Sequence, residues 1–474
     1  MTRTGGTIRV TMLLALWLGM GWAQQDSGTQ ENPPSSNRTP APAYGVDNTP
    51  PAVSENPPIS GLDLPSLEPR GISRSFLLPG AQVSEAVDSN VGDSTSNSAI
   101  NGVTRVLGSL TLQKLWANYN AAVDYVGGGA FYTNRAVNAA QLHTLDTDQR
   151  ILWRTGQLAI RDAFSYLPEG SFGYGSFGGV GAFGGLTGGI PGGIGGTSFF
   201  GPGQFLALGQ QPRITNTTVI DVTQQFTPRS SAFVAGSFGL VHFTDENTDF
   251  IDSQQISGQA AYNYQLNRSN QVAVLYGYQN FHYPTAGSGN FETHLWHLLW
   301  GHRITGRMDL VVGGGPQLTE IHSFFFDNSR LSLSGRASLR YRFTSAYVSA
   351  NYEHYNTSGS GFFAGASSDL LRFSYGKPLH RRWLMTVDTG YTHNNRILPN
   401  PAFAGSRTYH SLYAGASLHR DFGRNFSGFV SYQFNHLGFD TGFCDNTQGP
   451  CSRTSDRNVA IFGLNWHPRP IRLD

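Results

Sequence analysis

The chain has 474 residues, and its 32 basic and 31 acidic side chains leave a formal net charge of +1. A nearly neutral chain has no global field that would attract a nucleic acid or an acidic substrate, so neither is expected as a partner. Only 13% of the residues are charged, against about a quarter in soluble domains, yet a mean hydropathy of −0.27 is too low for a bundle of membrane-spanning helices.

Residues 1–23 have the pattern of a secretory signal peptide. Two arginines precede a short apolar stretch over 10–23, and Gly21 and Ala23 place small residues where a signal peptidase cleaves. The apolar stretch is shorter than the roughly 20 residues that a spanning helix needs, so an uncleaved anchor is the weaker alternative. The sequence therefore predicts export.

Residues 24–104 are rich in proline, serine and asparagine. Up to about residue 70 such a composition cannot bury enough apolar surface to offset the entropy of ordering the chain. Residues 71–104 add short apolar patches in polar surroundings. We expect the whole segment to be largely disordered.

From about 105 to 467 the sequence alternates with a period of two. In 331–343 the odd positions are almost all apolar and the even positions are serine or arginine. A strand turns two such sets to opposite faces. Segments such as 346–353, 411–418 and 426–435 repeat the alternation, and strands of this length can cross a bilayer when tilted.

The connections between these segments alternate in length. Short polar turns, such as 305–307 and 344–345, are followed by longer stretches, such as 357–367 and 441–455. Outer-membrane barrels have short periplasmic turns and long extracellular loops, whereas a soluble sandwich mixes the two kinds. The prediction is an all-β, antiparallel transmembrane barrel over 105–467, with 24–104 in the periplasm and a soluble sandwich or propeller as the alternative.

Counting hairpins back from the C-terminus predicts about 16 strands, with 14 to 18 admissible, because single-chain bacterial barrels have an even number. Residues 104–113 also look like a strand, and counting them makes the number odd. This stretch is a periplasmic extension, a strand inside the lumen, or a sign that one hairpin is miscounted.

A glycine-rich segment at 168–206 falls on the extracellular side by the same alternation of loops. Gly173, Gly175 and Gly178 form a G-x-G-x-x-G pattern, but a dinucleotide site also needs a preceding strand, a following helix and a distal acidic residue. None of these is present, so no cofactor is predicted. The interleaved phenylalanines favour a loop folded into the lumen over one left in water.

The two cysteines, Cys444 and Cys451, flank a Gly-Pro turn in an exported chain, which favours a local disulfide over a metal site. His294 and His297 would point to opposite faces of one strand and cannot share a metal. Trp296 in the same strand is expected to face lipid, as is Trp300.

Three arginines at even positions share one face of a predicted strand. An arginine that faces lipid costs roughly 2–4 kcal/mol at the midplane, so this face is expected to line the lumen. Such charges either tune ion selectivity or form ordinary interior ion pairs. The candidate luminal charges are Arg336, Arg340, Arg342, Arg372, Glu353 and Asp388.

The last predicted strand alternates and ends on an aromatic residue, through Ala460, Phe462, Leu464 and Trp466. This end is similar to the C-terminal signal of the Gram-negative outer-membrane β-barrel (porin-like) class, which the region 105–467 resembles. The resemblance implies an outer-membrane location, contact with outer-membrane lipid, and recognition by the barrel-assembly machinery. The chain departs from the pattern because a tail, 468–474, continues beyond the strand.

The function expected from this pattern is a passive diffusion channel for small solutes. The chain has no G-x-S-x-G and no H-E-x-x-H motif, so an enzyme is not expected, and no catalytic residue or metal is assigned. The alternatives are a structural or adhesive surface protein with a plugged lumen, and a channel for secretion or polysaccharide. The sequence leaves the oligomeric state open.

Overall fold

The computed structural model describes most of the chain from Ser75 to Leu473. The signal peptide, the proline-rich segment up to residue 74, the glycine-rich segment 168–206 and Cys451 lie outside the described residues. The ranges described are 75–90, 100–133, 139–167, 212–244, 250–284, 289–323, 327–343, 346–359, 361, 363–380, 382–398, 406–423, 425–444 and 453–473.

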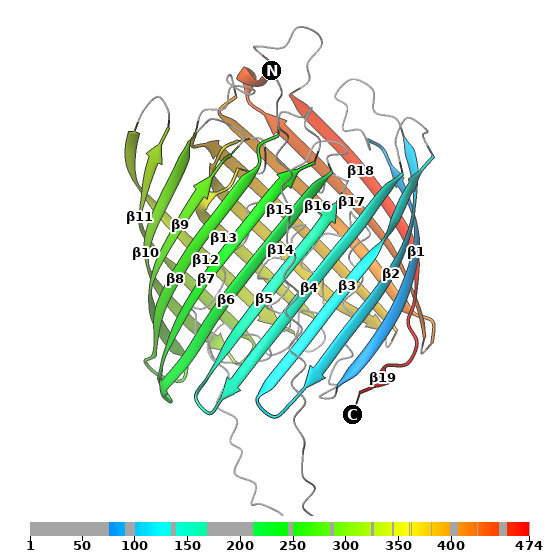
Figure 1. Cartoon of the computed structure of the whole chain (residues 1–474), viewed down its shortest axis with the longest axis horizontal. Helices are drawn as coiled ribbons and strands as arrows, with labels where there is room; N and C mark the ends of the chain where they lie inside the picture. The colour runs from blue at the N-terminus through cyan, green and yellow to red at the C-terminus, as the bar shows by residue number, and fades with distance from the viewer. Residues whose placement is uncertain are drawn as a thin grey trace, which may run out of the picture. The chain divides into compact units, whose positions relative to one another are not determined.

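The described residues form one closed antiparallel barrel of 18 strands, in which each strand pairs with the next along the chain (Figure 1). The strands are β1 (Phe76–Asp88), β2 (Asn101–Leu115), β3 (Tyr119–Tyr132), β4 (Ala140–Trp153), β5 (Gly156–Leu167), β6 (Arg213–Thr227), β7 (Ser230–Phe243), β8 (Ser253–Gln265), β9 (Asn270–His282), β10 (Asn290–Thr305), β11 (Met308–His322), β12 (Asp327–Arg342), β13 (Tyr347–Thr357), β14 (Ala366–His380), β15 (Trp383–Arg396), β16 (Thr408–Asp421), β17 (Phe426–Phe439) and β18 (Thr454–Trp466).

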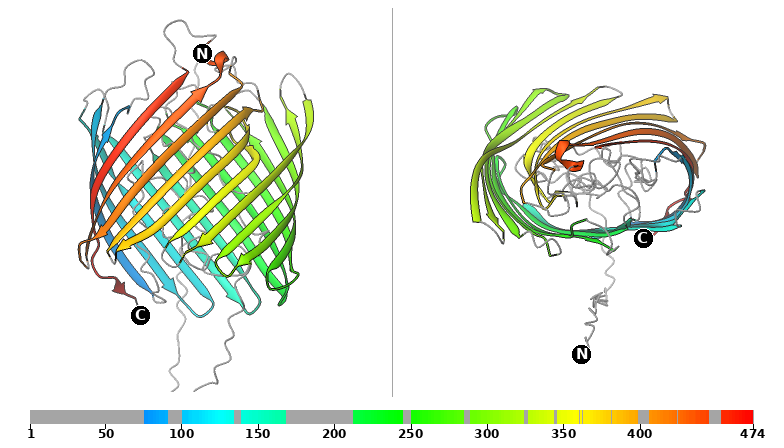
Figure 2. Two further views of the ribbon diagram at one scale, coloured as in Figure 1. Left: turned by 180° about the vertical axis from the view of Figure 1, so that it is seen from behind. Right: turned by 90° about the horizontal axis from the view of Figure 1, so that it is seen from above.

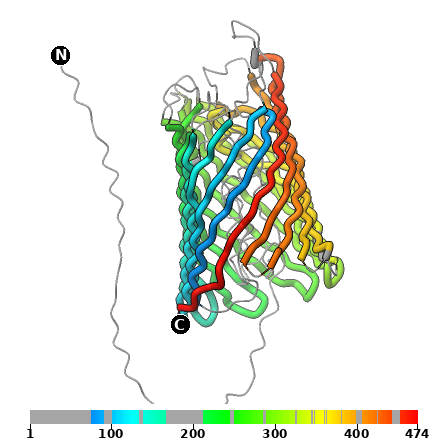
Figure 3. The backbone as a smooth tube through the Cα atoms, turned by 90° about the vertical axis from the view of Figure 1, so that its right-hand side faces the viewer, coloured from blue at the N-terminus to red at the C-terminus, as the bar shows by residue number. Residues whose placement is uncertain are grey.

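The barrel closes where the first strand meets the last. β1 pairs with β18 from Ala81 opposite Trp466 to Asp88 opposite Val459, and the two strands lie side by side in Figure 3. A short strand, β19 (Ile471–Arg472), pairs with the start of β1. The C-terminal tail therefore adds to the wall beside the first strand.

The all-β barrel is confirmed, but the expected number of about 16 strands was wrong. The N-terminal hairpin of β1 and β2 supplies strands that were not counted, so the barrel starts at Phe76 and not near 105. The stretch 104–113 is part of β2 and pairs with β1 along its length, which removes the odd count. Part of the segment expected to be largely disordered is thus a barrel strand.

The alternation of β1 is normal at Val83 and Val87, which face outward, but reversed at Glu85 and Ala86, which helps explain why it was missed. Ala86 faces inward and is buried, whereas Glu85 faces outward and accepts a hydrogen bond from the Thr104 hydroxyl at 2.6 Å. Pro79 and Gly80 further interrupt the pattern. Pairing with β2 and β18 forms this strand despite its weak local signal.

The lengths of the connections distinguish the two ends of the barrel. At one end, here the short-turn end, connections such as 154–155 and 306–307 join the strands. At the other, the long-loop end, connections such as 89–100 and 440–453 join them. Both the start of β1 and the end of β18 lie at the short-turn end, as an even number of strands requires.

The outer face of the wall is apolar and the inner face is polar, the reverse of a soluble protein. Leu331 and Leu333 are 72% and 74% exposed, while Ser334 next to them is 5% exposed. Trp296 and Trp300 face outward, as predicted. Among the described residues, no helix is long and apolar enough to span a membrane.

Candidate functional site: the inner wall

The predicted arginines of β12 face the barrel interior. Arg336 and Arg340 share the face of the buried Ser334, opposite to that of Leu333. Arg336 lies opposite Glu353 of β13 in the strand register. The side chain of Arg342 lies outside the described residues.

Arg372 and Asp388, predicted as luminal charges, form an ion pair between β14 and β15. Nη2 of Arg372 lies 3.0 Å from Oδ2 of Asp388, and Nε donates to the same oxygen at 3.1 Å. The hydroxyls of Ser374 and Tyr413 also donate to the carboxylate. A buried carboxylate with three neighbouring donors is well compensated for its loss of water.

Hydrogen bonds and register extend this group across neighbouring strands. The Ser338 hydroxyl donates to Oδ1 of Asn351 at 2.6 Å, and Asn351 lies opposite Arg372. A polar inner face thus runs from β12 to β16. We call its charged residues the basic wall: Arg336, Arg340 and Arg372 with Glu353 and Asp388.

A second charged group, which the sequence analysis did not single out, faces inward from β3 to β6. Asp124 of β3 lies directly opposite Asp146 of β4, although like charges in that position repel. Nη2 of Arg150 lies 2.5 Å from Oδ2 of Asp148 in the same strand. We call this group the acidic wall: Asp124, Asp146, Asp148 and Asp221 with Arg150 and Arg161.

The acidic wall had the same sequence signal as the arginines, namely charge at alternate positions of one strand. Asp146 and Asp148 are two residues apart, like Arg340 and Arg342. Their partners lie on other strands, because Arg161 comes from β5 and makes an ion pair with Asp221 of β6. Only the closed barrel brings these groups together.

The two walls face each other across the barrel. β4 and β13 are nine strands apart in a ring of 18, which is half of the circumference. Figure 2 shows β12 to β18 in front and the strands of the acidic wall behind them. The acidic wall has two more carboxylates than guanidinium groups, and the basic wall has one more guanidinium group than carboxylates. The charge difference across the barrel axis holds for these two groups; Arg105 of β2 and Arg213 of β6 also face inward, nearer to the long-loop end.

The connection between β13 and β14 folds back into the barrel near the long-loop end. We call its described residues, 358, 359, 361 and 363–365, the inward connection. Ser358 accepts a hydrogen bond from the Tyr283 hydroxyl at 3.1 Å, and Gly361 accepts one from the backbone of Ile251 at 2.9 Å. On the other side, Leu398 donates its backbone N–H to Ala364 at 3.2 Å. The inward connection is thus held by three other connections.

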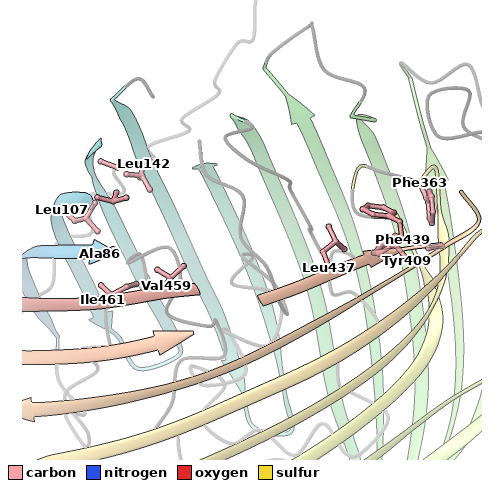
Figure 4. Close-up of a cluster of buried hydrophobic side chains, with 12 residues drawn as sticks. Ala86, Leu107, Leu142, Phe363, Tyr409, Leu437, Phe439, Val459 and Ile461 are labelled. Carbon is pink, nitrogen blue, oxygen red and sulfur yellow. The ribbon is translucent and has the colours of Figure 1, made fainter. Parts of the chain in front are cut away.

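Apolar contacts fix the inward connection to the inner wall on two sides. Phe363 packs on Tyr409 of β16, with ring centroids 5.1 Å apart, while Ala364 packs in a cluster with Phe281 of β9 and Phe291 of β10. Figure 4 shows Phe363 beside Tyr409 and Phe439, apart from the labelled residues of β1, β2, β4 and β18. The connection therefore bridges two separate stretches of wall.

Gly365 has a structural requirement at the end of this connection. Its φ is +84°, which side-chain-bearing residues rarely adopt. A Cβ placed there would lie 2.3 Å from the ring of Phe291. The backbone can approach the wall this closely only as glycine.

The remaining predicted residues divide into placed and undescribed ones. Phe462, Leu464 and Trp466 of the C-terminal strand face outward and are 58%, 59% and 41% exposed, and Ala460 shares their face. The disulfide between Cys444 and Cys451 stays a prediction because Cys451 lies outside the described residues. Within the described ranges, no group of three or more histidine, cysteine, aspartate or glutamate residues could hold a metal ion.

No family model and no curated protein matches the chain. It is similar to solved barrels at low identity. OccAB4 of Acinetobacter baumannii is 10% identical with a TM-score of 0.43, over 84% of this chain and 99% of that one. The outer membrane protein OpdK of Pseudomonas aeruginosa is 10% identical with a TM-score of 0.40, over 83% and 98%. The ferric-catecholate import receptor Fiu of E. coli is 9% identical with a TM-score of 0.41, over 82% and 81%. The function is therefore inferred from the residues of this chain.

Proposed function

We propose that the chain is an outer-membrane β-barrel channel that conducts small charged solutes by diffusion. The observation that carries this proposal is the distribution of side chains on the closed barrel. Large apolar side chains are exposed around the outside, whereas arginine and aspartate line the inside. In water the outer face would be a very large apolar patch, and in lipid it is the expected surface.

The orientation follows from the two ends of the barrel. Short turns face the periplasm and long loops face the exterior in barrels of this class. The start of β1 and the end of β18 accordingly lie on the periplasmic side. The proposed partners are outer-membrane lipid and, through the outward aromatic residues of β18, the barrel-assembly machinery.

The inner charges support a channel that orients charged solutes. Barrels of 16 to 18 strands enclose a lumen wide enough for water unless loops fill it. Opposed acidic and basic walls would act on a passing solute by attracting its two ends in opposite directions. The inward connection supports a narrowing of this lumen toward the exterior.

Planar-bilayer recording of the purified, detergent-folded protein tests the proposal. We expect steady single-channel openings with a conductance that depends on the ionic strength. Protein that migrates as a folded, heat-modifiable barrel but gives no openings would contradict a diffusion channel. The recording should be repeated after deletion of residues 168–206 and, separately, with a Gly365→Ala substitution that displaces the inward connection. The two variants test whether either segment blocks conduction.

A plugged surface protein is the second candidate, and the inward connection is the observation that favours it. This candidate predicts no openings in the intact protein, even though its barrel is folded. Openings that appear only after residues 168–206 are deleted or Gly365 is substituted would support it over the open channel.

A further inference from the structure

A continuous row of ionisable side chains crosses the outer face of the barrel near the long-loop end. It takes one residue from each of six consecutive strands, β13 to β18. All six share the outward face of their strands, and we call them the outer row: His354, Asp369, His393, His410, His436 and Asp456.

The register makes these side chains neighbours. Asp369 lies opposite both His354 and His393, and His393 lies opposite His410. The rings of His410 and His436 have centroids 5.6 Å apart.

Two carboxylates complete the row. Nδ1 of His354 lies 2.8 Å from Asp369, whose Oδ1 also accepts a hydrogen bond from the Tyr352 hydroxyl at 2.8 Å. Nδ1 of His436 lies 2.6 Å from Oδ1 of Asp456. The row is therefore a connected polar stripe. Asp369 lies near its β13 end, and Asp456 lies at its β18 end.

The stripe marks the edge of the apolar outer surface. On the same strands and the same face, nearer to the short-turn end, lie side chains that are 37% to 52% exposed: Tyr352, Leu371, Tyr391, Leu412 and Tyr432. Tyrosine is common where an apolar surface meets the headgroups of a bilayer. If the barrel spans a membrane as proposed, the outer row lies at the level of the headgroups of the outer leaflet.

Histidines concentrate at this level around the whole barrel. Of the 14 in the chain, nine face outward in the half of their strands nearer to the long-loop end. The other five that face outward there are His143, His242, His282, His294 and His322.

Protonation reverses the charge of the outer row. With four neutral imidazoles the two carboxylates leave it at −2, and with four protonated imidazoles it reaches +2. Histidine changes charge between about pH 5 and 8. Protonated His393 and His410 would then be like charges directly opposite each other, which is unfavourable unless an anion lies against them.

We propose that the outer row binds the phosphate groups of outer-leaflet lipid headgroups, and that this binding strengthens as the pH falls from about 8 to 5.5. The inference rests on the proposed membrane location and names the headgroup chemistry of the lipid that the outer row would bind. Phosphate presents several acceptor oxygens and negative charge, which suits a row of imidazolium donors.

The charged and titratable neighbours of the row are few in the described part of the chain. Along the row they are its own members, together with Tyr352, Tyr391 and Tyr432 on the adjoining outward positions. Asp440, with Arg407 and Arg396 beside it, lies just beyond His410 toward the long-loop end. Within the row itself the histidines are the groups that gain positive charge.

The test compares the thermal stability of the full-length protein in two kinds of vesicle, phosphatidylcholine alone and phosphatidylcholine with diphosphoryl lipid A. Heat-modifiable migration gives the midpoint at pH 8 and at pH 5.5. We expect lipid A to raise the midpoint by about 3 °C or more at pH 5.5, and by clearly less at pH 8. An equal effect of lipid A at both pH values would overturn the proposal.

Two variants of opposite charge sharpen the test. His393→Gln with His410→Gln should remove at least half of the pH-dependent gain from lipid A. Asp369→Asn with Asp456→Asn should enlarge the gain and extend it toward pH 8. Changes in the same direction in both variants would indicate a structural effect and would refute binding through charge.

The control is the double variant His302→Gln with His419→Gln, which removes one outward and one inward histidine at the short-turn end. It should keep the full pH-dependent gain. Free inorganic phosphate at the same concentration should give no gain, because the proposed ligand is a headgroup in the membrane plane. A pH-dependent oligomer in vesicles without lipid A would show that a second copy covers the row, and would also overturn the proposal.

Failure of this inference is distinguishable from failure of the proposed channel. Protein that inserts into vesicles and conducts, but shows no pH-dependent response to lipid A, contradicts only the outer row. Protein that responds to lipid A without conducting contradicts only the diffusion channel.

Discussion

Arg457 and Asp88 join the first and last barrel strands through side chains that are 2% and 0% exposed. Nε of Arg457 donates to both carboxylate oxygens, at 3.1 and 2.9 Å. A buried carboxylate or guanidinium group is tolerated only when its charge is compensated in this way. Variants of this pair therefore measure how much an uncompensated buried charge lowers the free energy of unfolding where the barrel closes.

Removing one partner of this pair should be strongly destabilising. We expect Arg457→Ala to lower the free energy of unfolding by about 3–5 kcal/mol, because Asp88 would remain buried without its partner. Urea unfolding in vesicles, followed by tryptophan fluorescence, measures the change. The double variant Arg457→Leu with Asp88→Leu should be closer to the wild type, and equal losses in both variants would contradict this explanation.

Asp440, just after the end of β17, has a pKa below the ordinary value. Partial burial alone would raise the pKa, but backbone N–H groups of Arg407 and Thr408 donate to Oδ2 at 2.7 and 3.0 Å and outweigh it. A carboxylate with a lowered pKa in the folded state stabilises that state above its unfolded pKa of about 3.9. The contribution is lost as the pH falls through the lowered folded value.

The lowered pKa of Asp440 predicts how the effect of the Asp440→Asn substitution on stability depends on pH. The wild type should be more stable than the variant at pH 6, and the difference should shrink below about pH 4, where the carboxylate begins to be protonated in the unfolded chain before it is protonated in the folded protein. Unfolding midpoints measured between pH 6 and 3 give the comparison. A difference that stays constant down to pH 3 would show that the charge of Asp440 is not responsible.

At the scale of elements, displacement of the inward connection should have the largest effect on the single-channel conductance. Gly365→Ala introduces a Cβ at positive φ and against the ring of Phe291, so the connection should leave its place on the wall. We expect a larger single-channel conductance, with a barrel that still migrates as folded. Gly423→Ala, where a Cβ would meet no atom within 4 Å, is the control and should leave the conductance unchanged.

The strands that the sequence predicted and the strand that it missed differ in one physical respect. β12 has arginine and serine on one face and leucine on the other, so its own side chains show which face is wet. β1 reverses this pattern at Ala86, which is buried inside, and at Glu85, which faces outward and accepts a hydrogen bond from Thr104 on the neighbouring strand. The alternation within one segment cannot reveal a hydrogen bond that a side chain of another strand makes to an outward polar group.

The inner wall shows the same limit. Arg336, Arg372 and Asp388 were predictable because each lies in a strand with clear alternation. The opposition of the acidic and basic walls depends on the number of strands between them, which a count of about 16 would have set differently. The inward connection depends on hydrogen bonds among four connections, and no local pattern encodes those.

At the scale of the whole molecule, the two walls should act oppositely on ion selectivity. Asp124→Asn with Asp146→Asn removes the two facing carboxylates from one side, so the preference for cations should fall. Arg336→Gln with Arg340→Gln removes two positive charges from the other side, so the preference for cations should rise. Reversal potentials under a salt gradient measure both changes.

The combined variant is the internal control for this pair of predictions. The two sites lie on opposite sides of the barrel and share no partner, so their effects should add. We expect the four substitutions together to return the reversal potential close to that of the wild type. An unchanged reversal potential in all three variants would show that these residues do not face the conducting path.

The pairing between β1 and β18 also determines when the barrel can close during assembly. A chain exported from its N-terminus presents β1 first, and the partner of its free edge arrives only with the last strand. During that interval the edge of β1 is a template for pairing with other chains. The contacts between β1 and β18 are distant in sequence and form slowly, because the chain between them must lose entropy before the pairing can stabilise the barrel. We expect a chain truncated before β18 to aggregate even though it retains all the other strands, since no local rearrangement can protect the edge that β18 would have covered.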